Sequence, residues 1–329
     1  MENQLLISII IPAYNAQTTI TKTLEACLSQ NCPYEYEIIV VDDGSTDSTA
    51  DIVKSYPVRH IYQKNAGPAK ARNTGWKAST GEIVCFTDSD CIPHLNWVST
   101  LIGGFDSGEI GAVAGSYEIA NKESLLAQCI HEEIKYRHAR FGHYIRAFGS
   151  YNIAIRRDVL EQVHGFDESY RTASGEDNDL SYKILKAGYK IAFRGDALVA
   201  HHHTERLWKY LKEQYRHGYW RTRLYRDHPD MIKGDDYTQW KDVIEPFLAI
   251  TTLFLIPLFW ILYAKELLLI ILFCNFILQI KIPLIVSSNK KDIRFFYLIL
   301  ITFLRSFARG IGMFKGILHI VKEHVRVYK

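Results

Sequence analysis

The segment Ile83-Val84-Cys85-Phe86-Thr87-Asp88-Ser89-Asp90 decides how the fold of this chain is interpreted. Five uncharged residues are followed at once by two aspartates that stand one residue apart. Such a run is typical of a strand with both faces covered. Two carboxylates just beyond it can chelate a divalent cation, which can carry a diphosphate. Asp and Ser are also common in solvated turns, so the context of the triplet decides between these interpretations.

Apolar runs alternate with amphipathic stretches over the first ninety residues. The predicted strands are residues 5–12, 37–41, 58–62 and 82–87. Between them, apolar residues recur at helical spacing from Ile20 to Leu28, Ser48 resembles a helix start, and Pro68 suits a first helical turn. Strands connected by helices predict an α/β fold, with a sheet covered by helices on both faces.

Polar and glycine residues follow each predicted strand. They are residues 13–15, residues 42–47, residues 64–68 with Arg72 and Asn73, and residues 88–90. In open α/β sheets, ligands bind beyond the carboxyl ends of the strands. An aromatic ring for stacking, an acid for a base N–H, an arginine for phosphate and a metal-binding pair are the groups that hold a nucleoside diphosphate. The sequence therefore predicts a nucleoside diphosphate site at this edge.

Several motifs, in this order, resemble the family 2 glycosyltransferases of GT-A fold, and the resemblance covers residues from about 5 to about 225. The motifs are Ile9–Asn15, Val40–Asp47, Ala71–Gly75, Asp88–Asp90, Asn152–Arg157, Gly165–Glu168, Gly175–Leu180 and Lys186–Tyr189. The resemblance implies a Rossmann-like mixed sheet flanked by helices. It also implies a nucleotide-sugar donor, for which a UDP-sugar is our first expectation, and a divalent cation, Mg²⁺ or Mn²⁺.

The resemblance assigns roles to individual residues. Asp177 matches the catalytic base, and Asp88 and Asp90 match the metal-binding motif. A histidine after the last strand completes the metal shell in related transferases; His201 fits this place and His203 is the alternate, although surface histidines at a strand end explain the run equally well. The donor-binding residues that it implies are Pro12, Ala13, Tyr14, Asp42, Asn65, Arg72, Asp88 and Ser89.

These roles make chemical sense. A hard cation with oxygen ligands neutralises the charge that accumulates on a departing diphosphate. A carboxylate such as Asp177 is ionised at neutral pH and can accept the proton of an attacking hydroxyl. A single base across the sugar from the leaving group implies direct displacement and inversion. Glu176 is the neighbouring alternative for the base, and Asp179 is explained by the preference for acids at helix N-termini.

The last third of the chain carries long apolar stretches. Residues 246–264 contain no charge and approach the roughly 20 residues that cross a bilayer, so we expect a span there. Residues 267–286 would return as the second limb of a hairpin; a re-entrant or interfacial hairpin is the alternative. Residues 295–321 are interrupted by three basic residues and predict an amphipathic surface helix, with a third span as the alternative.

The segment 204–227 is basic and aromatic. We expect it to rest on anionic lipid head groups or to hold a phosphorylated lipid acceptor. It lacks the Gln-x-x-Arg-Trp spacing of processive synthases, which favours transfer of one or a few sugars. Basic residues before the first apolar stretch and in the tail predict, by the positive-inside rule, a cell-membrane protein with its catalytic domain and C-terminus in the cytosol.

Length and composition suit this organisation. The 329 residues predict three ranges: residues 1–115 as the nucleotide-sugar-binding half, 116–240 as the acceptor half with the base and a juxtamembrane helix, and 241–329 as membrane-associated helices. No signal peptide is evident, and the six dispersed cysteines favour reduced packing residues. The net charge of +3 is too small to indicate nucleic-acid binding.

Together these observations predict a membrane-associated, metal-dependent, inverting glycosyltransferase. Its acceptor would be a hydroxyl of a lipid-linked or cell-surface glycan, and its partners the donor, this acceptor and membrane lipids. One alternative is a polyprenyl-phosphate sugar transferase, which would not need Asp177 to deprotonate a hydroxyl. Another is a non-catalytic nucleotide-binding membrane scaffold, against which intact Asp88, Asp90 and Asp177 argue.

Overall fold

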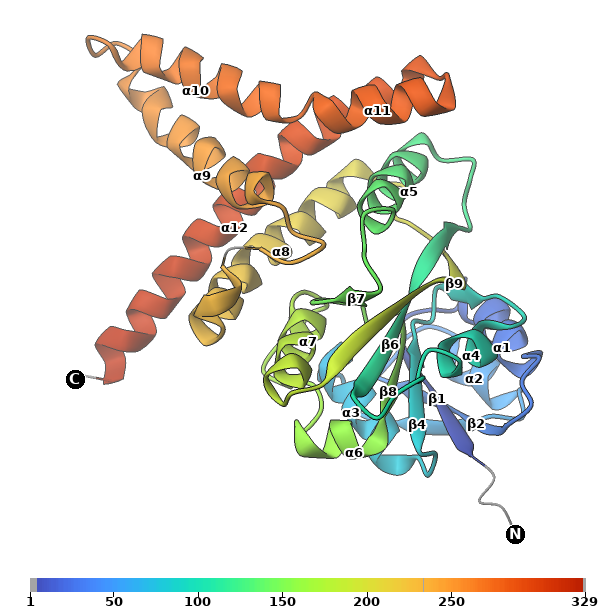
Figure 1. Cartoon of the computed structure of the whole chain (residues 1–329). Helices are drawn as coiled ribbons and strands as arrows, with labels where there is room; N and C mark the ends of the chain where they lie inside the picture. The colour runs from blue at the N-terminus through green and yellow to red at the C-terminus, as the bar shows by residue number, and fades with distance from the viewer. Residues whose placement is uncertain (1–4, 233, 328–329) are drawn as a thin grey trace. The chain divides into compact units, whose positions relative to one another are not determined.

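The computed structural model describes residues 5–232 and 234–327, with the side chains of 326 and 327 left aside (Figure 1). The chain divides into two compact units. The sheet unit comprises the residues up to Asn121 together with Arg140–His202, and the helical unit comprises Lys122–Ala139 together with the residues from His203 on. The predicted ranges 1–115, 116–240 and 241–329 divide the chain by function, and they stay a prediction. The two compact units have different boundaries.

Nine strands of the described residues form one mixed sheet. Their order is β3-β2-β1-β4-β8-β6-β9-β5, and β7 pairs with β9. The parallel part is β3, β2, β1 and β4, whereas β8 is antiparallel to both of its neighbours. The strands are β1 (Leu6–Ala13), β2 (Glu35–Asp42), β3 (Arg59–Tyr62), β4 (Ile83–Thr87), β5 (Cys91–Pro93), β6 (Ile110–Ile119), β7 (Tyr144–Ile145), β8 (Asn152–Arg156) and β9 (Lys190–His201). The predicted α/β class with a mixed sheet is therefore confirmed.

Helices cover both faces of the sheet. They are α1 (Ile20–Leu28), α2 (Thr49–Lys54), α3 (Pro68–Ala78), α4 (Trp97–Ile102), α6 (Arg157–Gln162) and α7 (Glu176–Lys186). Successive residues of a strand point to opposite faces, and in β1 Ile9 and Ile11 enter one apolar core while Ile10 enters the other. This double burial explains why the strand sequences are continuously apolar. Gly75 of α3 lies so close to Ile10 that a Cβ there would collide with its side chain.

The helical unit contains long helices of mixed character. They are α5 (Leu125–His138), α8 (Leu207–Asp227), α9 (Trp240–Leu255), α10 (Ala264–Leu278), α11 (Lys281–Lys290) and α12 (Tyr297–Val327). A small apolar core joins α5, α8, α11 and α12 through Leu126, Cys129, Tyr210, Ile282, Val286, Phe295, Leu298 and Ile301. The predicted juxtamembrane helix is present as α8, within the basic and aromatic segment 204–227.

The prediction of one continuous span over residues 246–264 is wrong. Helix α9 ends at Leu255, a 3-10 turn occupies Ile256–Leu258, and Tyr263 has a left-handed backbone (φ 64°). Pro257 lacks the N–H that would continue the helix, so the chain turns there.

Two other segments are long and apolar enough to cross a membrane, judged by length and composition: Ala264–Lys290 and Ile293–Val325. The first contains the predicted returning limb, and the second contains the predicted amphipathic helix.

Candidate active site

The loops that follow β1 and β2 are joined through Asn15. Its backbone is left-handed (φ 50°), a conformation that Asn adopts more readily than most residues. Asn15 Oδ1 accepts a hydrogen bond from the Thr46 N–H (2.8 Å), and the Asn15 N–H donates to Ser45 Oγ (3.0 Å). Of the predicted nucleoside pocket, Pro12 and Ala13 are buried in β1, whereas Tyr14 is 52% exposed and presents its ring at the surface.

The two acids at the end of β2 do different work. Asp43 Oδ1 accepts from the Ala66 N–H and Asp43 Oδ2 from the Gly67 N–H, both at 2.9 Å, so Asp43 orders the loop before α3. The predicted donor residue Asn65 belongs to this loop and donates to the Asp43 carbonyl (2.9 Å). Asp42 is fully buried and accepts from the Ser45 N–H through Oδ1 (2.8 Å).

Asp42 Oδ2 is buried and has no hydrogen-bond partner among the described residues. The Nε2 atom of His60 lies 3.8 Å from Asp42 Oδ2. A buried acceptor without a partner costs free energy, so such groups are expected where a ligand supplies the missing donor. Asp42 therefore keeps one acceptor available, in contrast to Asp43.

Arg72 links the end of β4 to the start of α7. Its side chain is buried and donates to Asp88 Oδ1 (2.7 Å) and to Glu176 Oε1 (3.1 Å). Its guanidinium also lies over the ring of Phe166, 5.6 Å from the centroid. Burial alone would lower the pKa of Arg72, but the charges of Asp88 and Glu176 raise it. The guanidinium is thus a permanent cation between two carboxylates.

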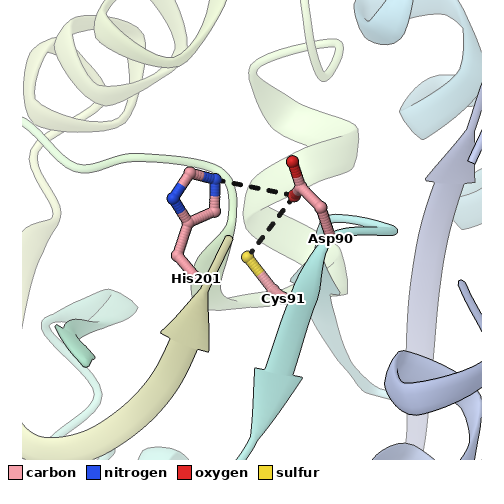
Figure 2. A group of neighbouring side chains, drawn as sticks. All are labelled: Asp90, Cys91 and His201. Atoms are coloured by element: carbon pink, nitrogen blue, oxygen red, sulfur yellow. Dashed lines mark hydrogen bonds and ion pairs between the residues drawn. The ribbon is translucent and has the colours of Figure 1, made fainter. Parts of the chain in front are cut away.

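Asp88 and Asp90 have different surroundings. Asp88 Oδ1 accepts a hydrogen bond from Arg72. Ser89, which lies between the two aspartates in the sequence, accepts a hydrogen bond from Thr23 Oγ1 through its carbonyl (3.1 Å). Asp90 instead lies beside His201, with 3.6 Å between its Oδ1 and the histidine Nε2 (Figure 2). The antiparallel pairing of β5 with β9 sets Cys91 opposite His201 and so brings these residues together.

The group drawn in Figure 2, Asp90, Cys91 and His201, has ligand atoms close enough to share one metal ion. Burial alone would raise the pKa of Asp90, but the neighbouring His201 holds it below the ordinary value. Burial and the carboxylates of Asp90 and Asp88 raise the pKa of Cys91 well above its usual value, which keeps the thiol protonated. A carboxylate fits Mn²⁺ or Mg²⁺, an imidazole suits Mn²⁺ better than the harder Mg²⁺, and a neutral thiol suits neither.

The alternate histidine, His203, belongs to the helical unit. It is buried there, and its ring centroid lies 5.8 Å from that of His131. Within the described part of the chain, the group with metal-binding geometry contains His201 and not His203. The choice of His201 over His203 agrees with this grouping, and its role as a ligand stays a prediction.

The start of α7 presents two acids with opposite environments. Glu176 is buried, and its Oε2 accepts from the Ser174 N–H (2.7 Å) while its Oε1 faces Arg72. Asp177 is partly exposed, and its Oδ2 accepts from the Ser150 N–H (3.3 Å). Glu176 is therefore occupied within the protein, whereas the carboxylate of Asp177 can meet a ligand.

Both acids have raised pKa values. Burial, together with the charge of Asp177, raises the pKa of Glu176 to about 7, although Arg72 opposes the change. Burial also raises the pKa of Asp177, again against Arg72. The third acid of this turn, Asp179, is buried with an ion pair to Lys183 (3.5 Å), so it contributes to the helix itself.

The motif Ala71–Gly75 is hydrogen-bonded to the motif Gly165–Glu168. Asn73 Nδ2 donates to the Phe166 carbonyl (2.8 Å) and to Glu168 Oε1 (3.0 Å), and Asn73 Oδ1 accepts from the Phe166 N–H (3.0 Å). Gly165 before them has a left-handed backbone (φ 62°), which glycine adopts without strain. The segment from Gly165 to Glu168 thus holds α3 in place instead of facing a ligand.

An aromatic cluster beside His201 was not found from the sequence. Tyr117 of β6 and Tyr151 stack with 3.7 Å between ring centroids and 11° between planes, and the His201 ring is 5.3 Å from Tyr117. Both tyrosines are partly exposed. The buried Asn152 fixes this corner by donating to the Ser116 carbonyl at 2.9 Å. No sequence spacing pairs Tyr117 with Tyr151, because the contact depends on how β6 and β8 adjoin.

Comparison with known proteins identifies the class. Residues 8–163 match the family model named glycosyl transferase family 2. Glycosyltransferase AglE of Haloferax volcanii is 30% identical over 228 residues, which are 64% of this chain and 71% of AglE. The probable glycosyltransferase YdaM of Bacillus subtilis is 34% identical over 205 residues, 57% of this chain and 48% of YdaM, so the chain spans about half of that relative.

Solved structures show the same fold. The mannosyltransferase PcManGT of Pyrobaculum calidifontis, in complex with GDP-Man and Mn²⁺, has a TM-score of 0.60 at 18% identity, covering 96% of this chain and 88% of its own. TarS residues 1–349 of S. aureus give a TM-score of 0.50 at 18% identity, covering 94% and 91%. The mixed sheet with its acidic edge is therefore a GT-A fold. The chain belongs to glycosyltransferase family 2.

Proposed function

We propose that this protein is a metal-dependent, inverting glycosyltransferase that moves a sugar from a nucleotide-diphosphate donor to an acceptor hydroxyl. The observation that carries the proposal is the continuous link from Asp88 through buried Arg72 to Glu176, next to the open carboxylate of Asp177. These hydrogen bonds connect Asp88 of the proposed metal-binding motif to Glu176, which directly precedes the proposed base Asp177. PcManGT was solved with GDP-Man and Mn²⁺, and GalNAc-T7 with UDP, GalNAc and Mn²⁺, which supports a donor and a cation of these kinds.

The donor would lie across the carboxyl edge of the sheet. The exposed ring of Tyr14 can stack on the base, and the unpartnered Oδ2 of Asp42 can accept a hydrogen bond from a base N–H. Asp90 and His201, with Asp88 adjacent in sequence, would hold the cation, which when bound neutralises the charge of the departing diphosphate. We take a UDP-sugar as the first donor to test.

Asp177 would act as the general base. The Ser150 N–H fixes one of its oxygens, which leaves the other for the acceptor hydroxyl. A raised pKa strengthens a carboxylate as a proton acceptor while it is ionised, because the ideal catalytic pKa lies near the working pH. A single base acting on the acceptor predicts inversion of the anomeric carbon. The stacked pair of Tyr117 and Tyr151 offers an aromatic surface on which a sugar ring can pack.

The test is turnover of UDP-, GDP- and dTDP-sugars, with and without Mn²⁺, by wild type, Asp177→Asn and Asp51→Asn. Asp51 is an exposed aspartate of α2 and serves as the matched control. We expect metal-dependent turnover that falls by about 10²–10⁴-fold in Asp177→Asn, with nucleotide binding retained. Full activity in Asp177→Asn would contradict the assignment of the base. Nucleotide binding without turnover, even with lipid extract as acceptor, would favour a scaffold.

A phosphorylated lipid is a second candidate for the acceptor. Helix α8 carries six Lys or Arg residues against two acids, which favours an anionic partner. A lipid phosphate is already ionised and needs no base, so a polyprenyl-phosphate transferase would keep its activity in Asp177→Asn. The same variant therefore separates transfer to a hydroxyl from transfer to a phosphate.

We also propose that the protein associates with the cell membrane through its helical unit. The support is that two segments, Ala264–Lys290 and Ile293–Val325, have the length and composition of spans. Large apolar side chains of the turn between α9 and α10 are exposed, Trp260 at 91% and Leu262 at 78%. The distribution of basic residues in the sequence favours a cytosolic sheet unit and a cytosolic C-terminus.

A further inference from the structure

Helix α12 has the hydropathy of a membrane span, but its packing does not suit a crossing. We infer that α12 lies along the surface of one leaflet, with one face on α8 and the opposite face on lipid. This inference rests on the proposed membrane association and specifies its geometry.

One face of α12 follows α8 along its length, and the two helices run side by side (Figure 1). Arg309 Nε donates to Gln214 Oε1 (2.9 Å), and near the C-terminus Glu323 pairs with Arg226 (3.4 Å). Between these contacts the backbones touch, because a Cβ at Gly312 would collide with the Tyr215 carbonyl. Residues 305–323 of α12 are therefore bound to residues 210–226 of α8.

Helix α8 cannot enter the hydrocarbon region with its partner. It carries six Lys or Arg residues and two acids within Leu207–Asp227. A basic or acidic residue at the bilayer centre costs roughly 2.5–3.5 kcal/mol on insertion scales. The part of α12 that remains before Arg305, residues 297–304, forms about 12 Å of helix, which is short of the ~30 Å hydrocarbon core. A crossing by α12 would therefore require separating it from α8.

The middle of α12 is also fixed to protein by buried charge. Arg305 donates from both terminal nitrogens to the Glu133 carboxylate of α5 (2.6 and 3.0 Å). Arg137 donates to the same carboxylate (2.8 Å). The next residue of α12, Ser306, accepts a hydrogen bond through Oγ from Asn275 of α10 (3.0 Å). These partners set the rotation of α12 about its axis and keep its polar face against the unit.

The opposite face of α12 is apolar and exposed. Its residues recur every three or four positions, which places them on one stripe about half a turn from the α8 face. They are Ile311, Phe314, Leu318, Val321 and Val325, from 39% to 54% exposed. Phe314 among them contacts Phe254 of α9, with 5.4 Å between ring centroids, which leaves Ile311, Leu318, Val321 and Val325 for lipid. Lys315 and Lys322 fall at the edge of this stripe, where a lysine can reach head groups while its stem lies on apolar surface. This is the pattern of an interfacial helix.

The occupant of this face is a leaflet that contains anionic lipid. The apolar stripe supplies area for the acyl boundary, and the basic residues of α8 and the stripe edge supply the attraction to anionic head groups. A consequence for topology is that α12 adds no crossing. Because α8 and α12 are bound to each other, they lie on the same side of the membrane, and the chain between them must leave the bilayer on the side where it entered.

Nitroxide labels can measure the depth of the stripe. In a Cys32→Ser, Cys274→Ser background, which removes the thiols that are not buried, single cysteines are placed at Ile311, Leu318 and Val325. The full-length protein is bound to vesicles of phosphatidylcholine and phosphatidylglycerol. We expect one shared shallow depth, about 5–10 Å below the head groups. A crossing helix would instead change depth by about 10 Å for every seven residues, and either that gradient or labels exposed to water would overturn the inference.

Sidedness gives an independent measurement. In the same background, Trp208→Cys at the start of α8 and His324→Cys, an exposed position of α12 outside the stripe, are reacted with a membrane-impermeant maleimide in sealed vesicles. We expect both cysteines to react from the same side, and reaction from opposite sides would overturn the inference. Transfer from the nucleotide sugar is assayed on the same preparations. Active enzyme with a depth gradient would refute only the position of α12, whereas active enzyme without vesicle binding would refute the proposed membrane association.

Discussion

At the scale of the residue, one cation organises the candidate site. Arg72 is buried between Asp88 and Glu176. Burial raises the pKa of Asp177, and the charge of Arg72 acts in the opposite direction. A buried cation needs such partners, because an unpaired charge in the protein interior is costly. Glu176 accepts from Arg72 and from the Ser174 N–H. We therefore propose that Glu176 is a positioning residue and that the adjacent Asp177 faces the acceptor.

Removal of Glu176 should weaken both the fold and the reaction. Glu176→Ala leaves Arg72 with one carboxylate and the Ser174 N–H without its acceptor. We expect a loss of about 1–3 kcal/mol in the free energy of unfolding and a lower kcat with a smaller change in the donor KM. Glu176→Gln should recover part of kcat, because its amide oxygen can still accept from one of the two groups. The exposed Glu161→Gln is the control, and equal activity of the alanine variant and wild type would contradict the positioning role.

The raised pKa of Glu176 predicts how stability depends on pH. Its ordinary value of 4.5 rises to about 7 in the folded protein because of burial. Between these values the folded state binds more protons than the unfolded state, so this group lowers stability as pH rises from about 4.5 to 7. Denaturant unfolding across that range should show a steeper decline for wild type than for Glu176→Gln. Parallel curves for the two proteins would argue against the shift.

At the scale of the element, local periodicity predicted most of the sheet unit. The four N-terminal strands and the helices between them lie within about two residues of their predicted bounds, because each is long and strongly patterned. The short strand β5 carries no such pattern, yet its pairing with β9 creates the contact between Asp90 and His201. The sequence therefore supplied the residues of the site, while their grouping depended on tertiary pairing.

In the helical unit, the position of proline predicted where a helix ends better than the apolar composition of the segment did. The uncharged run 246–264 suggested a span, but Pro257 ends the regular helix within it. Arg305 and Arg309 suggested a solvated face, whereas the structure buries Arg305 against Glu133 on another helix. That partner lies far away in sequence, so no local pattern could have revealed it.

The pair of Arg305 and Glu133 should contribute strongly to the stability of the helical unit. Arg305→Met leaves Glu133 buried, with its ion pair to Arg137 intact. We expect the free energy of unfolding in detergent to fall by about 3–5 kcal/mol. Combining Arg305→Met with Glu133→Gln should restore part of it. Arg294→Ala, which breaks the exposed pair with Asp292, is the control and should change the free energy of unfolding far less, because solvent screens exposed ion pairs. Similar losses from Arg305→Met and Arg294→Ala would contradict the role of burial.

At the scale of the whole molecule, the chain forms two units that interleave in sequence. Helix α5 lies between β6 and β7 in the chain but packs in the helical unit. This interruption explains why a division of the sequence into consecutive ranges does not follow the packing. It also means that the segment preceding the candidate base returns to the sheet unit only after contributing α5 to the helical unit.

Electrostatic attraction should make membrane binding depend on salt and on α8. A basic residue near an anionic surface contributes about 1 kcal/mol, so Lys209→Gln with Lys212→Gln should weaken binding to phosphatidylglycerol-containing vesicles by roughly 30-fold at low salt. Flotation assays at increasing ionic strength should reduce the difference between the variant and wild type, because screening acts on both lysines. Lys54→Gln with Lys77→Gln removes the same charge from the sheet unit and should leave binding unchanged. If this control weakened binding equally, net charge would explain the attraction and α8 would have no special part in it. If the α8 variant bound as tightly as wild type, the apolar stripe of α12 would have to hold the protein without electrostatic help.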